Sequence, residues 1–304
     1  MSTSTRTLIA ARHVDDVVEA LRDEAPLRVQ GAGTKRALWD GEGLTRGLDV
    51  SALSGVTRYQ PEELVLSLQA GTPVAEIQAL LDTRAQRLAF DPPDYAAVLG
   101  TQPGTTTIGG VISSGFAGPR RLSAGNVRDH LLGFEAVSGR GERFKAGGRV
   151  IKNVTGYDLP KLLCGAWGTL AVLTEITLRV LPRPELEATL VIERLSDEAA
   201  LRWMTQALNA PLELAAAAHE SSGESSRTYI RLEGFRSSVA ERVAQLTQMI
   251  GAAAPTHRVE DAESKRLWQR LRDLHYWAQD ARVIWRLSLP ASRSTKRAAV
   301  PAPP

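Results

Sequence analysis

Two short segments rich in glycine and threonine carry residue types suited to binding a phosphate group. The first is Gly31-Ala32-Gly33-Thr34, and the second is Thr107-Ile108-Gly109-Gly110. Glycine permits positive φ and leaves no Cβ between the backbone and a ligand, and successive amides in such a turn form a concavity that binds anions. The second segment continues with small residues: Ser113, Ser114 and Gly115. Taken together, the two segments predict a dinucleotide-binding site.

Each segment also has a purely structural interpretation. Gly31–Thr34 fits an ordinary turn between strands, and the second segment fits a close helix–sheet contact that merely requires small residues. Two other phosphate motifs are excluded by the residues present. The nicotinamide-type fingerprint needs a third glycine where Arg36 stands, and no Gly-Lys-[Ser/Thr] run opens a helix as nucleoside triphosphatases require.

Composition limits the classes of protein to consider. The chain has 304 residues, 43% of them hydrophobic and 23% charged, which is an ordinary globular balance and predicts about two domains. The single cysteine, Cys164, excludes an internal disulfide and fits a reducing compartment. No apolar run approaches the roughly 20 residues of a membrane span, and the polar N-terminus lacks a signal-peptide core. A net charge of +3 without a basic stripe argues against nucleic-acid binding.

The elements around these segments predict an α+β protein. Residues 63–70 alternate as a strand, residues 131–137 form an apolar strand, and residues 174–180 alternate again. The run Leu181-Pro182-Arg183-Pro184 is typical of a domain boundary. We therefore expect a first domain over 1–184, an α+β cap over 185–290 that ends in a strand at 282–289, and a disordered tail over 291–304.

The order of motifs over residues 7–184 resembles the FAD-binding domain of the p-cresol methylhydroxylase and vanillyl-alcohol oxidase superfamily. That domain consists of two subdomains. The segments that carry the resemblance are Gly31-Ala32-Gly33-Thr34, Thr107-Ile108-Gly109-Gly110, Asp129-His130-Leu131-Leu132-Gly133 and Gly165-Ala166-Trp167-Gly168-Thr169-Leu170. Members usually continue beyond a strand like 282–289 with further folded sequence, so the resemblance implies a shortened cap.

The resemblance implies a role for each of the small residues. The two glycine-rich segments would hold the FAD pyrophosphate, mainly through backbone groups, and Ser113, Ser114 and Gly115 would line the route to the isoalloxazine. Val172 would face the adenine. Some members attach the flavin through a His or Cys. Because the first loop has no histidine and Cys164 lies at a helix-to-turn position, we expect FAD to be bound without a covalent link.

A longer motif, Ile151-Lys152-Asn153-Val154-Thr155-Gly156-Tyr157-Asp158-Leu159-Pro160-Lys161-Leu162, is similar to the FAD-binding subunits of bacterial glycolate oxidase. This implies oxidation of glycolate, a 2-hydroxy acid, to glyoxylate, with a homologous flavoprotein subunit and an iron–sulfur subunit as partners. The location would be cytoplasmic or peripheral at the inner membrane through those partners. Two alternatives stay open: a stand-alone FAD-dependent oxidoreductase acting on another hydroxy acid or alcohol, and a non-catalytic flavin-binding assembly subunit.

No residue is singled out as catalytic. Oxidation of a hydroxy acid on flavin needs a base for the hydroxyl proton and a cation for the carboxylate. Tyr229, Arg231, His275 and Arg286 are candidates in the cap, but nothing in the sequence selects them over surface residues. No two of the five histidines stand at ligand spacing, so we expect no metal site. His130 lies within a scaffold motif and is expected to be structural.

Overall fold

The computed structural model describes residues 7–23, 25–38, 44–148, 157–222, 225–278 and 284–289. The chain divides into two compact units. The first comprises Met1–Arg183 and Arg272–Ala278, and the second comprises Pro184–Leu271 and Gln279–Pro304. The chain thus completes most of its first unit, builds the second, and contributes seven more residues to the first. That late contribution is not apparent from the sequence, and the tail expected over 291–304 lies outside the described residues.

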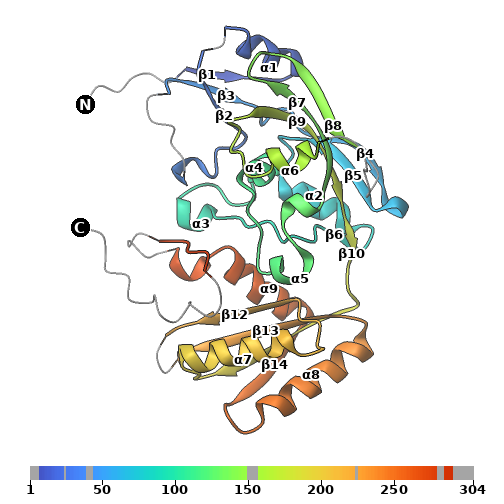
Figure 1. The fold of residues 1–304 in the computed structure, drawn as a ribbon, viewed down its shortest axis with the longest axis vertical. Helices are drawn as coiled ribbons and strands as arrows, with labels where there is room; N and C mark the ends of the chain where they lie inside the picture. Colours follow the sequence, from blue (N-terminus) through green and yellow to red (C-terminus); the bar gives the residue numbers. More distant parts are fainter. Residues whose placement is uncertain are drawn as a thin grey trace, which may run out of the picture. The chain divides into compact units, whose positions relative to one another are not determined.

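The first unit begins with a small parallel sheet in the order β1 (Thr7–Ala10), β3 (Arg46–Asp49), β2 (Arg28–Gln30). Helix α1 (Val14–Leu21) packs on it through Val17 and Leu21, which share a core cluster with Leu48 of β3. The cluster also includes Val137 and Val172 from the larger sheet of the same unit. The small sheet is therefore anchored by apolar contacts to the sheet described next (Figure 1).

The larger sheet is antiparallel, in the order β4 (Val56–Gln60), β5 (Val65–Gln69), β9 (Ala171–Arg179), β7 (Leu131–Ser138), β8 (Arg143–Gly147). Strands β5 and β9 lie inside the sheet and are almost wholly buried, as their apolar runs predict. A two-residue pairing of β6 (Gln86–Arg87) with β10 (Leu181–Pro182) follows β9.

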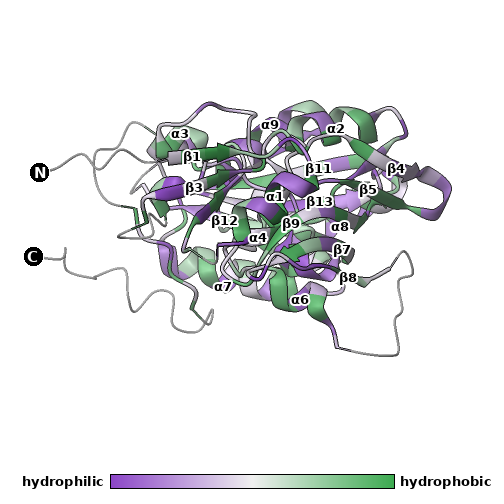
Figure 2. Cartoon of the chain, turned by 90° about the horizontal axis from the view of Figure 1, so that it is seen from above, coloured by the Kyte–Doolittle hydropathy of each residue, from purple (hydrophilic) through white to green (hydrophobic). Residues whose placement is uncertain are grey.

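Three short helices place residues in the core cluster of this sheet: α2 (Val74–Asp82), α4 (Ile108–Ser114) and α6 (Leu159–Leu163). Two one-turn helices, α3 (Ala96–Leu99) and α5 (Arg121–Ala124), lie in the connections. Helix α2 places Val74, Ile77 and Leu81 in the core, and Figure 2 shows apolar and polar residues mixed along it. Helix α4 buries Ile108, Val111 and Ile112 completely. One-turn 3-10 helices complete the connections at Arg36–Leu38, Pro61–Glu63 and Val127–Asp129.

The second unit is an antiparallel sheet in the order β12 (Ala216–Glu220), β13 (Arg227–Gly234), β11 (Leu186–Glu193), β14 (Thr256–Glu260). Because side chains alternate along a strand, β11 faces two layers. Leu190 and Ile192 belong to a core cluster with α7 (Asp197–Asn209) and α8 (Arg236–Ile250), whereas Val191 packs with Trp268 of α9 (Asp261–Arg272). A last one-turn helix spans His275–Trp277.

The expected fold class is confirmed: an α+β protein whose FAD-binding-type domain has two subdomains and is followed by an α+β cap. The strand expected at 282–289 is wrong over its described part, because residues 284–289 pair with no strand there. The fourth cap strand is instead β14, which pairs with β11 from Ala188↔Glu260 to Ile192↔Thr256. Among the described residues, no helix has both the length and the apolar character that a membrane crossing needs.

Candidate functional site

The two glycine-rich segments are in direct contact in the first unit. A Cβ atom added to Gly31 would lie 2.3 Å from Oγ1 of Thr107, well inside van der Waals distance. The hydroxyls of Thr34 and Thr106 lie 3.2 Å apart, so a hydrogen bond joins the same two segments. These segments are more than 70 residues apart in sequence, yet they form one surface.

That surface lines a hollow, which we call the cationic hollow. It encloses about 810 Å³ of empty space when the open solvent at its mouth is counted. Three basic residues line it, Arg28, Lys35 and Arg36, and none of the described lining residues is acidic. Its composition therefore suits an anionic ligand. The expected site residues that line it are Gly31, Ala32, Gly33, Thr34, Thr107, Gly109, Gly110, Ser113 and Ser114.

The backbone amides of the first loop are not used inside the fold. Gly33 has a φ of +70°, a left-handed conformation that glycine adopts without strain. Within the described residues, no hydrogen bond uses the amides of Ala32, Gly33, Thr34 or Lys35, whereas the carbonyl of Gly33 accepts from Arg36. Of these residues, Thr34 and Lys35 are buried, where a backbone amide is rarely left without an acceptor. Four successive donors without acceptors beside a hollow are typical of an anion-binding nest.

The second segment uses its amides differently from the sequence-based expectation. The Ile108 amide donates to the Thr72 carbonyl at 2.9 Å, and the Gly109 amide donates to the Ala70 carbonyl at 2.7 Å. The amide of Gly110 donates to the hydroxyl of Thr107, the N-cap of α4, at 3.3 Å. The sequence predicted that the amides of Gly109 and Gly110 both face a phosphate. That prediction is wrong for Gly109, because its amide is already hydrogen-bonded inside the fold.

The two glycines of the second segment have separate reasons to lack a side chain. A Cβ on Gly109 would lie 2.7 Å from the carbonyl oxygen of Ala70, so Gly109 permits close packing of α4 on β5's end. A Cβ on Gly110 would meet only Thr107 Oγ1 at 3.3 Å and the ammonium of Lys35 at 3.9 Å. Gly110 therefore keeps space open at the hollow, and Gly109 serves the fold.

Lys35 is a site residue that the sequence analysis missed. It directly follows the first loop, is 9% exposed and lines the cationic hollow. Burial lowers the pKa of its ammonium to about 8, while the negative charge of Asp94 partly opposes that shift. A signal was present in the sequence, since a basic residue immediately after a predicted anion-binding loop is well placed to face the same ligand.

Asp94 connects this lysine electrostatically with the second segment. Its carboxylate accepts hydrogen bonds from the Gly104 amide at 2.7 Å and from the Thr106 hydroxyl at 3.1 Å, and Thr106 is the residue whose hydroxyl meets Thr34. The Asp94 amide in turn donates to Asp273 at 2.9 Å, within the late segment of the first unit. The Asp94 carboxylate is thereby held behind the loops and does not line the hollow.

The remaining expected site residues lie elsewhere. Ile108 is fully buried in the core, and Gly115 ends α4 as a left-handed C-cap at φ +66°. Val172 lines a neighbouring hollow made largely of apolar residue types, including Leu27, Val137 and Leu170. The two hollows adjoin because they share four lining residues: Val29, Trp167, Gly168 and Ala171.

His130 has the structural surroundings expected of it. Its ring is fully buried, 5.7 Å from the Phe90 ring between centroids, and Nε2 lies 2.8 Å from the Ala124 carbonyl. Burial lowers the pKa of this imidazole. Within the described part of the chain, no group of three or more His, Cys, Asp or Glu residues is arranged to hold a metal ion.

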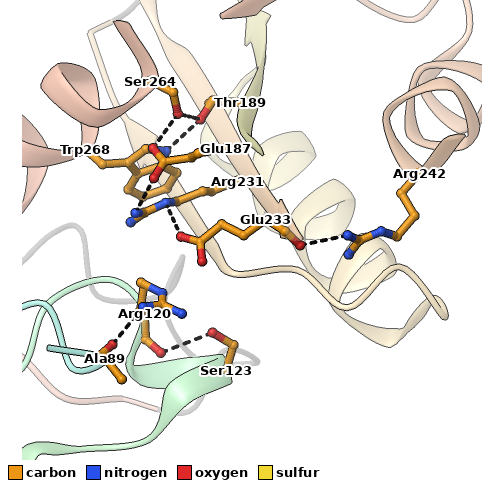
Figure 3. A network of polar contacts seen from close by, with 10 residues as sticks. All are labelled: Ala89, Arg120, Ser123, Glu187, Thr189, Arg231, Glu233, Arg242, Ser264 and Trp268. Carbon is orange, nitrogen blue, oxygen red and sulfur yellow. Dashed lines mark hydrogen bonds and ion pairs between the residues drawn. The ribbon is translucent and has the colours of Figure 1, made fainter. Parts of the chain in front are cut away.

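In the cap, Arg231 takes part in a buried network rather than in the solvated surface (Figure 3). Its Nη2 donates to Glu187 at 2.6 Å, its Nε lies 2.8 Å from Glu233, and its guanidinium stands over the Trp268 ring at 5.6 Å. The Tyr229 hydroxyl donates to Glu220 at 2.5 Å, and its pKa is raised, chiefly by burial. His275 and Arg286 are exposed.

Comparison with known proteins gives this geometry a family. The profile of the FAD binding domain family matches residues 6–147. The glycolate oxidase subunit GlcE of Escherichia coli (strain K12) is 35% identical over 284 residues, which is 91% of this chain and 73% of that protein. This chain belongs to the FAD-binding oxidoreductase family that includes the glycolate oxidase subunits. Its cofactor is FAD.

Other relatives match this chain over less than half of their own length. The glycolate oxidase subunit GlcD of Bacillus subtilis (strain 168) is 30% identical over 60% of this chain, but the match spans only 38% of that protein. A D-lactate dehydrogenase of Anaerostipes hadrus is 29% identical, over 62% of this chain and 40% of its own length. A solved structure of alkyldihydroxyacetonephosphate synthase matches 88% of this chain and 54% of its own chain. The TM-score is 0.70 and the sequence identity is 16%, which shows a shared fold.

Proposed function

We propose that this chain is the FAD-binding subunit of a multi-subunit glycolate oxidase. In such a complex glycolate, or a closely related 2-hydroxy acid, is oxidised to the 2-oxo acid, which for glycolate is glyoxylate. The observation that carries the proposal is the 35% identity to a glycolate oxidase subunit over 91% of this chain and 73% of that subunit. The adjoining cationic and neighbouring hollows support the proposal, because the predicted cofactor-binding residues line them in large part.

The structure fits a dinucleotide at these two hollows. We propose that the diphosphate lies in the cationic hollow, against the amides of Ala32–Lys35 and the hydroxyl-bearing side chains of Thr34 and Thr107. The adenine would extend into the neighbouring hollow beside Val172, and Ser113 and Ser114 would line the opposite route toward the flavin ring. Because the described lining of the cationic hollow contains neither His nor Cys, we propose that FAD is held without a covalent bond.

When bound, FAD supplies the hydride acceptor for oxidation of a hydroxy acid. The protein's own contribution at this site is binding and orientation. The loop amides balance the charge of the diphosphate, and the contact between Gly31 and Thr107 holds the two loops at a constant separation. Gly110 keeps the backbone free of a side chain beside the ligand.

The partners proposed are a homologous flavoprotein subunit and an iron–sulfur subunit that receives the electrons. The complex would act in the cytoplasm or at the inner membrane through those subunits. The cap supports a role for partner subunits, because its candidate substrate-binding side chains already have partners within the cap. Arg231 contacts Glu187 and Glu233, and Tyr229 donates to Glu220. A carboxylate-binding cation and a base for the substrate would then come from a partner subunit.

The internal pairing of Arg231 and Tyr229 also favours a second function, that of a non-catalytic subunit that binds FAD and serves assembly. The two functions differ in whether this chain's own flavin is reduced by substrate. If the reconstituted complex reduces two flavins per set of subunits with glycolate under anaerobic conditions, the catalytic reading is supported. If only the flavin of the homologous subunit is bleached, the assembly role replaces it.

The primary test is isolation from the native host with an affinity tag on this chain. We expect an oxidised-flavin absorption spectrum, release of FAD on heating, and co-purification of a second flavoprotein and a ferredoxin-like subunit identified by mass spectrometry. Turnover of glycolate with an artificial acceptor by this chain alone would instead favour a stand-alone oxidoreductase. A preparation that neither contains nor binds FAD would contradict the proposal.

A further inference from the structure

Lys35 is the buried cation of the described chain whose charge has no direct partner in the fold. Only 9% of its surface is exposed, and its ammonium lies beside Gly110 at the wall of the cationic hollow. Within the described residues, neither a hydrogen bond nor an ion pair is formed by this side chain. The ammonium itself still reaches the hollow, because it is not among the fully buried polar atoms that lack a partner. A partly desolvated ammonium without a counter-charge is a favourable partner for an anion that enters there.

The nearest electrostatic influence on Lys35, the Asp94 carboxylate, is occupied elsewhere. Its two oxygens accept from the Gly104 amide at 2.7 Å, the Thr106 hydroxyl at 3.1 Å and the Ala96 amide at 3.2 Å. No ion pair joins Asp94 to Lys35 in this part of the chain. The lysine lines the hollow and the carboxylate does not, so an anion that enters the hollow would meet the ammonium and not the Asp94 carboxylate.

We infer that Lys35 is a side-chain ligand of the FAD diphosphate, and that its protonation makes the affinity of this chain for FAD depend on pH above neutrality. The inference rests on the proposed function, which supplies the cofactor's place, and adds a specific residue and a property to it. The amides of Ala32–Lys35 and the Lys35 ammonium would form one composite anion site, because both come from the same turn and line the same hollow.

The direction of the pH effect follows from the charges that face Lys35. Burial lowers its pKa to about 8, Asp94 raises it, and Arg28 and Arg36 line the same hollow. A bound diphosphate favours the protonated ammonium and so raises its pKa in the complex. Above about pH 8 binding must therefore take up a proton, and FAD affinity falls by up to about tenfold per pH unit.

The experiment uses the full chain stripped of flavin and titrated with FAD or riboflavin at pH 7 and at pH 9, with binding followed by flavin fluorescence. Riboflavin is the comparison because it lacks the phosphate groups. The variants are Lys35→Met, which keeps the length of the side chain without its charge, and Lys35→Arg, which keeps a charge that stays protonated at both pH values. The matched control is Lys145→Met, the same change at an exposed lysine of β8 in the same unit.

We expect the unaltered chain to bind FAD more weakly at pH 9 than at pH 7. Lys35→Met should weaken FAD binding at pH 7 by about 10- to 100-fold, as loss of a charge-assisted hydrogen bond predicts, and should show no fall between the two pH values. Lys35→Arg should keep its FAD affinity at pH 9. Riboflavin binding should change less than about twofold in all variants, and Lys145→Met should behave as the unaltered chain.

Two results would overturn the inference while leaving FAD binding intact. One is a Lys35→Met variant that binds FAD like the unaltered chain at both pH values, and the other is an equal loss of FAD and riboflavin binding, which shows damage to the flavin site as a whole. If the unaltered chain binds no FAD, the proposed function falls and the inference with it. Circular dichroism of each variant, with Lys35→Arg as the more conservative change, confirms that folding is retained.

Discussion

Gly31 and Thr107 approach so closely that no side chain fits between them: a Cβ on the glycine would lie 2.3 Å from the threonine hydroxyl and 3.1 Å from its methyl group. Thr107 is itself the N-cap of α4, with its hydroxyl accepting from the Gly110 amide. The threonine can therefore yield only by giving up its cap. This contact brings together the two loops that form the cationic hollow, which the Thr34–Thr106 hydrogen bond also joins.

Replacing Gly31 by alanine should separate the loops. We expect Gly31→Ala to lower the free energy of unfolding by about 1–3 kcal/mol, as overpacking does, and to weaken FAD binding. Chemical denaturation and FAD titration measure the two effects. Gly33→Ala is the comparison: its Cβ would meet nothing within 4 Å, so only the strain of its φ of +70° is added, about 1–2 kcal/mol.

A double variant separates the contact from other effects. Thr107→Ala removes the atoms that Gly31→Ala would strike, so the pair should cost less than the sum of the single changes. Strict additivity in a double-mutant cycle would show that the two loops are not in contact in solution.

The two glycines of the second segment should respond differently to the same substitution. Gly109→Ala places a methyl group 2.7 Å from the Ala70 carbonyl and is expected to lower stability strongly. Gly110→Ala meets only Thr107 at 3.3 Å and points toward the Lys35 ammonium at 3.9 Å, so its main effect should be on FAD affinity. Thermal unfolding of the flavin-free chain and FAD titration compare the two. Equal loss of stability in both variants would contradict this division.

The buried network of the cap predicts a large loss of stability on removing one charge. Glu187 is 2% exposed and accepts from Arg231 at 2.6 Å and from Ser264 at 2.7 Å. Glu187→Ala removes the buried hydrogen bonds to Arg231 and Ser264 and leaves the guanidinium with Glu233 as its carboxylate partner, so we expect a loss of about 1.5–3 kcal/mol in unfolding free energy. Urea unfolding followed by tryptophan fluorescence measures it.

A surface pair in the same sheet provides the control for that experiment. Glu193 lies 4.0 Å from Arg227, and both side chains are at least one-third exposed. Glu193→Ala should cost less than about 1 kcal/mol, because an exposed ion pair is screened by solvent. If the Glu187 and Glu193 variants lose similar amounts, the buried network does not stabilise the cap as described.

Lys35 should also leave a mark on the stability of the flavin-free protein. Its folded pKa of about 8 lies below the ordinary lysine value of 10.5, so below pH 8 the folded state carries the full penalty of a largely buried ammonium. Between about pH 8 and 10.5 the unfolded chain binds more protons, and this contribution to stability rises with pH. At pH 7, Lys35→Met is therefore expected to be more stable than the unaltered chain.

The measurement is the difference in unfolding free energy between Lys35→Met and the unaltered chain. It should shrink as pH rises from 8 toward 10, and the difference removes the opposing titration of groups such as Cys164, whose pKa burial raises to about 11. Saturating FAD should reverse the order at pH 7, because the ligand supplies the missing counter-charge. A difference that does not vary with pH would show that Lys35 is not desolvated in the folded chain.

Local patterns predicted the larger elements and the two loops well. Strands β5 and β9 follow from apolar alternation at residues 63–70 and 174–180, and the glycine-rich runs at 31–34 and 107–110 do meet at one hollow. These features depend on a few neighbouring residues. The fold class and the cofactor followed from the resemblance that those motifs carried.

What the sequence did not disclose depends on distant partners. The amide of Gly109 is taken by Ala70, and Arg231 is neutralised by Glu187, 44 positions away on a neighbouring strand. Neither pairing can be recognised from nearby sequence. Arg231 therefore remained a catalytic candidate, and the Gly109 amide was predicted to bind phosphate. The strand predicted at 282–289 is wrong over residues 284–289, which pair with no neighbour among the described residues.

The return of Arg272–Ala278 to the first unit has a practical consequence for dissecting the protein. Asp273 is 2% exposed, accepts from the Asp94 amide and holds Arg272 through two hydrogen bonds of 2.7 and 2.8 Å. A recombinant fragment that stops at residue 184 would lack Arg272–Ala278 and leave the Asp94 amide without its acceptor, the Asp273 carboxylate. Cleavage of the loop before β14 should not release the C-terminal piece, because that piece still contributes Arg272–Ala278 to the first unit.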